Sequence, residues 1–321
     1  MKTLYFLGVD GGGTKTEFVC IDGRGAVAAR QIEDTTYHLQ VGLDGAVRAL
    51  EAGVAGICAQ LGIAPSELTY AFFGLPAFGE DSAIDPQLER HCGRLLGHDR
   101  YRCGNDMICG WAGSLACADG INLVAGTGSI GYGERQGRAA RAGGWGEIFS
   151  DEGSAYWIAI QGLNAFTRMS DGRLPKGPLY RAFRDHFGLD ADIDICARVM
   201  GKQGLQRGEI AGLAPIVSQA AAAGDEAAIR INDQAAGELA AMAEALRTEL
   251  GFAADELVPL SWSGGVLTNN SPVRSRLEAL LREKARYRFV EPQHSPAYGA
   301  ALYAAHLADA DPLHPVNGER P

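Results

Sequence analysis

The segment DGGGTKT at residues 10–16 follows directly on an apolar run at residues 4–9. A buried strand is therefore predicted to lead into three consecutive glycines. Because glycine adopts backbone angles that a Cβ forbids, successive N–H groups can turn inward around an anion. Thr14 and Thr16 add hydroxyl donors and Lys15 adds a positive charge. The segment is predicted to bind phosphate, and a tight hairpin turn with Asp10 as a turn former is the alternative interpretation.

A second segment repeats this pattern further along the chain. Residues 121–125 form another short apolar run, and Gly126-Thr127-Gly128-Ser129 follows it. In both places a strand, a glycine turn and a further strand come next. This internal duplication predicts two similar domains, with one loop on each side of the phosphate chain of a nucleotide. Neither glycine cluster has the spacing of a Rossmann fingerprint or a P-loop.

Composition bounds the class of protein. A chain of 321 residues is predicted to form two domains, and its 46% hydrophobic and 21% charged residues are ordinary for a globular protein. The net charge of −10 argues against a nucleic-acid partner, because Lys and Arg grip the phosphate backbone. Seven cysteines without a CxxC pair indicate reduced thiols. With no signal-peptide layout and no apolar run of about 20 residues, we expect a cytoplasmic protein without a membrane partner.

Hydrophobic periodicity places the predicted elements along the chain. Three strands at residues 4–9, 17–21 and 26–30 are expected to form an antiparallel meander. Apolar residues at three- and four-residue spacing predict a helix that opens at Asp44 and is closed by Gly62. Further strands are expected at 70–73, 101–103, 257–260 and 287–290, and further helices at 87–96, 154–166, from 225, 272–284 and 296–306. The helix at 154–166 is expected to have its N-cap near Asp151 or Gly153.

The two glycine loops resemble the phosphate-1 and phosphate-2 motifs of the superfamily that unites sugar kinases, actin and the heat-shock chaperone ATPases. Three further runs resemble the N-acetylglucosamine kinase family and its relatives, the activator ATPases of 2-hydroxyacyl-CoA dehydratases and benzoyl-CoA reductases. They are GGWG at 143–146, SDEGSAYW at 150–157 and SGGV at 263–266. The similarity covers nearly the whole chain, and DEGSAYW is its most specific part.

The resemblance implies an α/β fold of two duplicated ribonuclease-H-like (actin-like ATPase) domains with a nucleotide cleft between them. The first is expected at residues 1–117, with a C-terminal helix at about 305–321 packing back on it. The second is expected at 118–304, with an inserted lobe at about 170–208.

The resemblance also implies ATP and Mg²⁺ as cofactors. Phosphoryl transfer needs charge neutralisation, in-line placement and an acceptor for the proton of the attacking hydroxyl. Asp10 is expected to hold the Mg²⁺, directly or through water. Gly264 and Gly265 match the family's adenosine-binding position, although alone they are typical of an ordinary turn. The residues expected to bind the nucleotide are Gly11, Gly12, Gly13, Thr14, Lys15, Gly126, Thr127, Gly128, Ser129, Gly264 and Gly265.

Asp106 resembles the family's catalytic aspartate, because it stands at a strand end some twenty residues ahead of the second glycine loop. A carboxylate there can take the proton of a sugar hydroxyl as that hydroxyl attacks phosphorus. The alternative is an N-cap for the helix that begins near Met107, where Asp is favoured. Both roles are compatible with the sequence.

The expected sugar site contains an aromatic residue between glycines. Trp145, between Gly144 and Gly146, offers a flat apolar face to a pyranose ring, and burial in the core is the alternative. Asp151 is expected to accept hydrogen bonds from sugar hydroxyls. In the family an asparagine before a histidine also contacts the sugar, whereas this chain has Tyr37 before His38. This departure leaves the exact amino sugar open, and His38 taken alone is more typical of a solvated loop.

The leading functional prediction is an ATP-dependent kinase of the 6-hydroxyl of an amino sugar, most of all N-acetylglucosamine, with glucosamine as the alternative substrate. The activator ATPases hold an iron–sulfur cluster through cysteines beside the second phosphate loop, and residues 126–156 contain none. An activator-type ATPase without a cluster is therefore a further alternative. A third alternative is an actin-like filament protein or a sugar-binding regulator. Analogy with the family predicts a homodimer.

Overall fold

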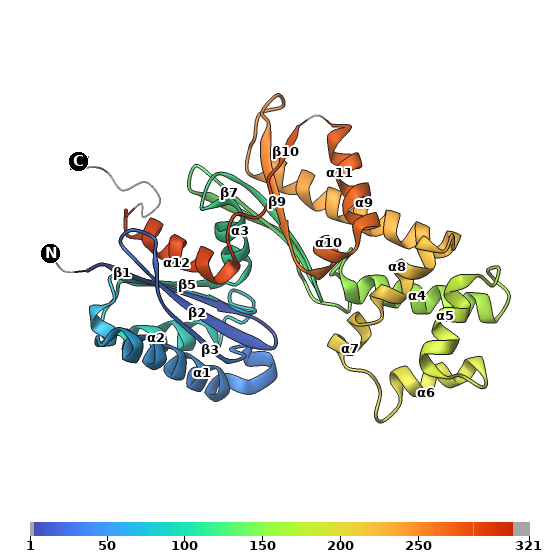
Figure 1. Cartoon of the computed structure of the whole chain (residues 1–321), viewed down its shortest axis with the longest axis horizontal. Coiled ribbons are helices and arrows are strands. Elements are labelled where there is room, and N and C mark those ends of the chain that lie inside the picture. Colours follow the sequence, from blue (N-terminus) through green and yellow to red (C-terminus); the bar gives the residue numbers. More distant parts are fainter. Residues whose placement is uncertain (1–2, 285, 311–321) are drawn as a thin grey trace. The chain divides into compact units, whose positions relative to one another are not determined.

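The computed structural model describes residues 3–284 and 286–310 (Figure 1). The chain divides into two compact units. Unit 1 comprises the described residues up to Asp119 and those from Val290 onward, and unit 2 comprises Gly120–Phe289. Each unit has its own sheet and its own hydrophobic core.

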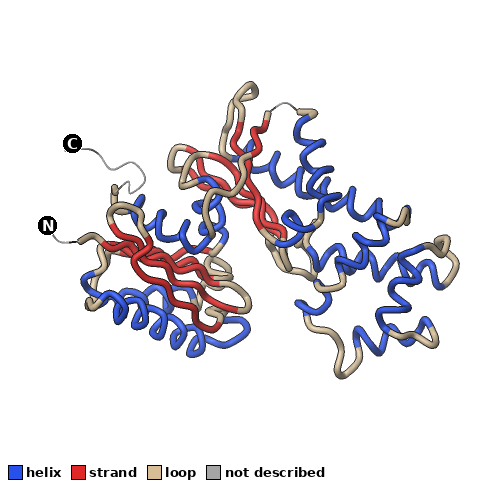
Figure 2. The backbone as a smooth tube through the Cα atoms, viewed as in Figure 1, coloured by secondary structure: helices blue, strands red, loops and turns tan. Residues whose placement is uncertain are grey.

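Unit 1 contains a five-stranded sheet in the order β3-β2-β1-β4-β5. Strands are drawn in red in Figure 2. The first three strands form the predicted antiparallel meander, and β4 and β5 run parallel to β1. Asp10 pairs with Glu17 on one side and with Gly74 on the other. The strands are β1 (Tyr5–Gly11), β2 (Lys15–Asp22), β3 (Val27–Asp34), β4 (Tyr70–Leu75) and β5 (Tyr101–Asn105).

Helices cover both faces of this sheet. They are α1 (His38–Leu61), the 3-10 turn η1 (Pro65–Glu67), α2 (Asp85–Leu96), α3 (Met107–Leu115) and α12 (Pro296–Leu307). The helix expected from Asp44 begins earlier, because a first turn at His38 joins it across a kink at Gly42, whose φ is 70°. Gly62 ends the helix with a φ of 66°, as expected for a left-handed C-cap.

The close packing of α12 on the sheet depends on glycines. A Cβ on Gly8 of β1 would lie 2.0 Å from the backbone nitrogen of Ala301. A Cβ on Gly299 would lie 2.1 Å from the backbone nitrogen of Gly113 in α3. Backbone therefore meets backbone at both places, which only glycine allows. Residues 311–321 of the expected C-terminal segment lie outside the described residues.

Unit 2 repeats the topology of unit 1, with the sheet order β10-β9-β6-β7-β8. An antiparallel meander is again followed by two strands parallel to its first strand, so the predicted duplication is confirmed. Gln136 and Gly137 turn the chain between β7 and β8 with φ values of 50° and 75°, as a two-residue hairpin requires. The strands are β6 (Gly120–Ala125), β7 (Ser129–Arg135), β8 (Arg138–Gly143), β9 (Val258–Ser263) and β10 (Tyr287–Phe289).

The helices of unit 2 include short ones at residues 170–208, where an inserted lobe was expected. The helix expected from residue 225 is α9, and Asp225 caps it, since its carboxylate accepts hydrogen bonds from Ala227 N–H and Ala228 N–H. The elements are α4 (Ala155–Ser170), α5 (Pro178–Phe187), the 3-10 turn η2 (Asp192–Asp194), α6 (Ile195–Met200), α7 (Arg207–Ala211), α8 (Ala214–Ala222), α9 (Glu226–Glu249), α10 (Gly265–Asn269) and α11 (Ser271–Arg282). Residues 170–208 thus form short helices rather than a further sheet.

The N-cap of α4 is Ser154, whose Oγ accepts a hydrogen bond from Trp157 N–H at 3.1 Å. The cap was expected near Asp151 or Gly153, and it is the residue directly after Gly153. Gly153 has a φ of 82°, and the carboxylate of Asp151 is bound elsewhere, by Arg207. The chain therefore makes a left-handed turn before the helix begins.

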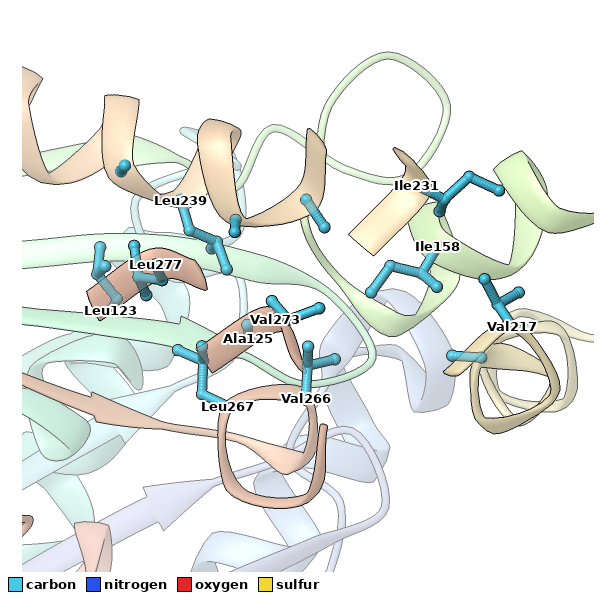
Figure 3. Close-up of a cluster of buried hydrophobic side chains, with 14 of the residues drawn as sticks. Leu123, Ala125, Ile158, Val217, Ile231, Leu239, Val266, Leu267, Val273 and Leu277 are labelled. Atoms are coloured by element: carbon cyan, nitrogen blue, oxygen red, sulfur yellow. The ribbon is translucent and has the colours of Figure 1, made fainter. Parts of the chain in front are cut away.

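The core of unit 2 holds the base of the second glycine loop in place. Leu123 and Ala125 at the end of β6 are fully buried in it. Leu239 of α9 and Leu267 of α10 belong to the same cluster (Figure 3). Because this strand end is anchored on both sides, the loop that follows it starts from a fixed position. Within the described residues, no helix is both long and apolar enough to cross a membrane.

Candidate active site

The first glycine turn joins β1 to β2. Gly12 N–H donates to Lys15 O at 2.9 Å, and Thr35 Oγ1 donates to Gly12 O at 2.6 Å. A Cβ on Gly11 would lie 2.5 Å from neighbouring side-chain atoms, so this glycine is required by packing. A Cβ on Gly13 would meet nothing within 4 Å. The outer face of the turn is therefore open to an anion, while its inner face is packed.

The side chains around this turn differ in their availability. Lys15 has a side chain that is 59% exposed and lies 3.8 Å from Glu17, and Thr14 is exposed. Thr16, in contrast, is fully buried, and its Oγ1 accepts a hydrogen bond from Thr36 N–H at 3.0 Å. The expectation that Thr16 offers a hydroxyl to phosphate was wrong, because that hydroxyl fastens the turn to the segment after β3.

Two carboxylates lie at strand ends in unit 1. Asp10 is the second-last residue of β1, and Asp106 directly follows β5. Burial and, to a smaller extent, the charge of Asp106 together raise the pKa of Asp10 to about 8. Burial, with a smaller contribution from the charge of Glu80, raises the pKa of Asp106 to about 7. A cation bound here would stabilise the ionised forms of both carboxylates.

Asp106 stands at the N-cap position of α3, and its neighbour Asn105 accepts the hydrogen bond from the first helical N–H. Met107 N–H, at the start of α3, donates to Asn105 Oδ1 at 3.2 Å. Asn105 Nδ2 in turn donates to Phe78 O at 3.2 Å. Cys109 supports the other carboxylate: its thiol is buried and hydrogen-bonded to Asp10. Sequence reasoning missed both supporting residues, although Asn is a common N-cap residue.

His38 is the first residue of α1 and is only 6% exposed, so its interpretation as a solvated loop residue was wrong. Its Nε2 lies 4.0 Å from Asp81 Oδ2. Tyr37 presents its ring edge-on to the imidazole, with 6.4 Å between the ring centroids. The hydrogen bond from Thr35 to Gly12 ties this segment to the first glycine turn. Tyr37 and His38 thus belong to the surroundings of that turn.

The second glycine loop lies between β6 and β7 in unit 2. Gly126 N–H donates to Gly128 O at 2.9 Å and closes the loop. Ala155 N–H donates to Gly126 O at 2.9 Å, and Tyr156 N–H donates to Thr127 O at 3.2 Å. The start of α4 is therefore bonded directly to the loop. This contact gives the DEGSAYW stretch a structural role beside the second phosphate motif.

Two further contacts complete this half of the site. Ser129 Oγ donates to the backbone carbonyl of Glu152 at 2.7 Å, which ties β7 to the segment before α4. Gly264 has a φ of 92°, and a Cβ there would lie 2.5 Å from the carbonyl of Ala125 and 2.8 Å from Gly126 N. The glycine that precedes α10 therefore packs against the base of the second loop, and Gly265 begins the helix.

Trp145 is 68% exposed, which excludes its burial in the core. Gly144 and Gly146 flank it with φ values of 70° and 99°, so glycines are required on both sides. The guanidinium of Arg141 lies 5.1 Å from the centroid of the indole ring. A cavity of about 380 Å³ opens beside the ring, and Ala142, Gly143, Trp145, Phe149, Ser150, Glu152, Glu238, Ala241, Met242 and Ala245 line it.

Asp151 is buried in a left-handed conformation, with a φ of 58°. Burial raises its pKa, and the charge of Arg207 opposes this shift. Arg207 Nη2 lies 2.7 Å from Asp151 Oδ2. Sequence reasoning did not identify Arg207, because 56 residues separate the partners and no motif joins them.

The donor set favours a metal ion held together with phosphates. Among residues 3–284 and 286–310, no group of three or more His, Cys, Asp or Glu side chains gathers around a common point. Mg²⁺ usually takes one or two carboxylates, with water and substrate phosphates as its other ligands. Asp10, whose raised pKa a cation would lower, fits this arrangement.

The fold and the paired glycine loops define a nucleotide-binding protein of the actin-like ATPase type, as expected. Residues 7–304 match the BadF/BadG/BcrA/BcrD ATPase family, and the chain belongs to this family. It is 28% identical over 314 residues to N-acetyl-D-glucosamine kinase of Dictyostelium discoideum, with 95% of this chain and 98% of the relative covered.

Two other proteins are similar to this chain over nearly its whole length. The chain is 28% identical over 308 residues to N-acetylmuramic acid/N-acetylglucosamine kinase of Clostridium acetobutylicum, with 95% and 99% covered. A crystal structure of a Chromobacterium violaceum protein, provisionally named an N-acetylglucosamine kinase, superposes with a TM-score of 0.71 at 26% identity, with 95% and 100% covered. These similarities confirm the family resemblance and the fold inferred from the sequence.

Proposed function

We propose that this protein is an ATP-dependent kinase that phosphorylates the 6-hydroxyl of N-acetylglucosamine. The observation that carries the proposal is the state of Asp106. Its carboxyl is placed at a strand end, has a pKa near 7 and leaves the capping of α3 to Asn105. A group with this pKa is suited to accept a proton near neutral pH. The names of the two curated relatives support the same activity.

Each half of the site has a role in the proposed reaction. The N–H of Gly12 closes the first turn on Lys15, which leaves the N–H of Gly13, with Thr14 and Lys15, to hold phosphate oxygens of ATP. The second glycine loop would also hold phosphate oxygens, and Gly264 with Gly265 would lie against the adenosine. A Mg²⁺ ion held by Asp10 would supply neutralisation of the phosphate charge.

Sugar binding would use the side chains that the sequence predicts for it. The exposed face of Trp145 suits the C–H face of a pyranose, and the flanking Gly144 and Gly146 leave that face unobstructed. Asp151 would accept hydrogen bonds from hydroxyls of the ring. Tyr37 and His38 would contact the substituent that distinguishes one amino sugar from another. Asp106 would then accept the proton of the attacking 6-hydroxyl.

A screen of ADP release tests this proposal. ATP is supplied with N-acetylglucosamine, glucosamine, N-acetylmannosamine, glucose or no sugar. The proposal predicts the highest kcat/KM with N-acetylglucosamine and little release without sugar. Faster turnover of glucosamine would favour the alternative substrate, and sugar-independent release would favour an activator-type ATPase. We further propose a homodimer in the cytoplasm without a nucleic-acid partner, and light scattering on the purified protein tests the dimer.

A further inference from the structure

One guanidinium in unit 2 contacts two carboxylates of the segment at residues 143–153. Arg207 is the first residue of α7, where the inserted lobe returns to the rest of the unit. Its Nη2 lies 2.7 Å from Asp151 Oδ2, and its Nε lies 3.3 Å from Glu147 Oε2. These carboxylates belong to the segment that carries Trp145. Arg207 therefore holds two points of the proposed sugar-binding segment at once.

The same ion pair lies against the second glycine loop. A Cβ on Gly128 would come within 2.7 Å of Arg207 Nη2 and 2.8 Å of Asp151 Oδ2. Ser129 N–H also donates a hydrogen bond to the Asp151 carboxylate. Because Gly128 has no side chain, the ion pair can pack directly against the loop. Phosphate loop, sugar-binding segment and inserted lobe meet at this one contact.

Asp151 needs a partner in order to stay in place. It is 3% exposed and has a left-handed backbone, so neither water nor a relaxed conformation holds it. A guanidinium presents several donors in a rigid fork and can serve two carboxylates, whereas an ammonium acts as a point charge. Removing the arginine would leave a buried carboxylate with one backbone donor and would release Glu147.

We propose that Arg207 is a positioning residue that fixes Asp151 and the Trp145 segment for sugar binding, and thereby couples the inserted lobe to the active site. This inference rests on the proposed function, because it takes Asp151 as a sugar ligand. Arg207 acts through Asp151 and Glu147. The proposal predicts that the inserted lobe serves sugar binding through Arg207 near its C-terminal end, rather than through a surface of its own.

The kinetic test is a double-mutant cycle with Arg207→Gln, Asp151→Asn and the double variant. Arg207→Gln should raise the KM for N-acetylglucosamine about 10-fold to 100-fold and change the KM for ATP less than threefold, since a misplaced ligand weakens sugar binding. The double variant should lose less than the two single losses added as free energies, because both changes remove the Arg207–Asp151 ion pair, while the Arg207–Glu147 contact is lost only with Arg207. Arg207→Lys should recover part of the loss. Fully additive losses, or wild-type kinetics in Arg207→Gln, would overturn the proposal.

A second measurement does not depend on activity. Hydrogen exchange followed by mass spectrometry should show faster exchange over residues 144–152 in Arg207→Gln, with α9 unchanged. Arg198→Gln is the matched control, since Arg198 is exposed on α6 of the same lobe. Equal exchange in both variants would contradict the positioning role even if the wild type phosphorylated no amino sugar. That inactivity would overturn only the proposed function.

Discussion

Asp10 and Asp106 come close enough for the charge of Asp106 to raise the pKa of Asp10. Gly74 of β4 makes this approach possible. A Cβ there would lie 3.0 Å from Val9 O, 3.4 Å from the Cα of Asp106 and 2.2 Å from the Sγ of Cys109. A proposed metal ligand and a proposed general base are thus brought together across a strand that carries no side chain at this point.

Asp106→Asn should abolish most of the turnover. The amide keeps the shape of the carboxyl but cannot accept the proton, so kcat should fall about 10²-fold to 10⁴-fold. The Kd for ATP should stay within about threefold of wild type, since the glycine turn is untouched. Single-turnover kinetics and calorimetric titration measure the two quantities. A variant that retains most of its sugar-dependent rate would show that another group is the base.

The same substitution should stabilise the fold at neutral and higher pH. In the folded protein Asp106 keeps its proton up to about pH 7, whereas the ordinary pKa of an Asp side chain, as in an unfolded chain, is 3.8. Its contribution to stability is therefore fully present below about pH 4 and is lost as the pH rises through 7. Asparagine resembles the protonated carboxyl but does not titrate, so the variant loses none of this stability as the pH rises.

Thermal unfolding from pH 4 to pH 8 measures this effect. The Tm of Asp106→Asn relative to wild type should increase with pH up to about 7 and then level off, by several degrees in total. Asp44→Asn is the control, because Asp44 is exposed. A constant Tm difference for Asp106→Asn across this range would contradict the raised pKa.

Gly12→Val should weaken nucleotide binding. A Cβ at this position already lies 3.1 Å from Lys15 O, so a branched side chain must displace the turn and obstruct the anion's approach. We expect the Kd for ATP to rise at least 10-fold while the circular dichroism spectrum is kept. Gly23→Val, at the other end of β2, has its nearest neighbour at 3.4 Å and is the matched control. Equal ATP affinities in the two variants would refute phosphate binding by this turn.

Sugar should change tryptophan fluorescence mainly through Trp145. Its side chain is 68% exposed, whereas Trp111 and Trp262 are 1% and 6% exposed. A ring stacked on the indole replaces water and should shift its emission. The measurement is a titration with N-acetylglucosamine in wild type and in Trp145→Phe. A saturable change that persists undiminished in the variant would place the sugar elsewhere.

The elements nearest the two glycine loops could be predicted from sequence because their signals are local. An apolar run followed by glycines marks both β1 and β6, and the repeated strand and turn pattern revealed the duplication. The helix end at Gly62 and the helix start near Asp225 were recognisable for the same reason. The assignments of nucleotide-binding and sugar-binding residues stay predictions, which the variants above address.

Contacts between distant segments could not be predicted. The burial of Thr16 depends on Thr36, and the burial of His38 depends on a helix that begins before the kink at Gly42. Arg207 reaches Asp151 from the far end of an insertion whose helices carry no motif. In each case the local sequence is compatible with several roles for the residue, and tertiary packing decides which role it has.

The most direct test of the central claim is to identify the phosphorylated product. The protein is incubated with ATP, Mg²⁺ and N-acetylglucosamine, and the mixture is followed by phosphorus–proton correlation NMR. Our account predicts one new phosphate ester, coupled to the protons on C6 and formed in a 1:1 ratio with ADP. Formation of ADP and inorganic phosphate without a sugar ester, or an ester at another hydroxyl, would contradict it.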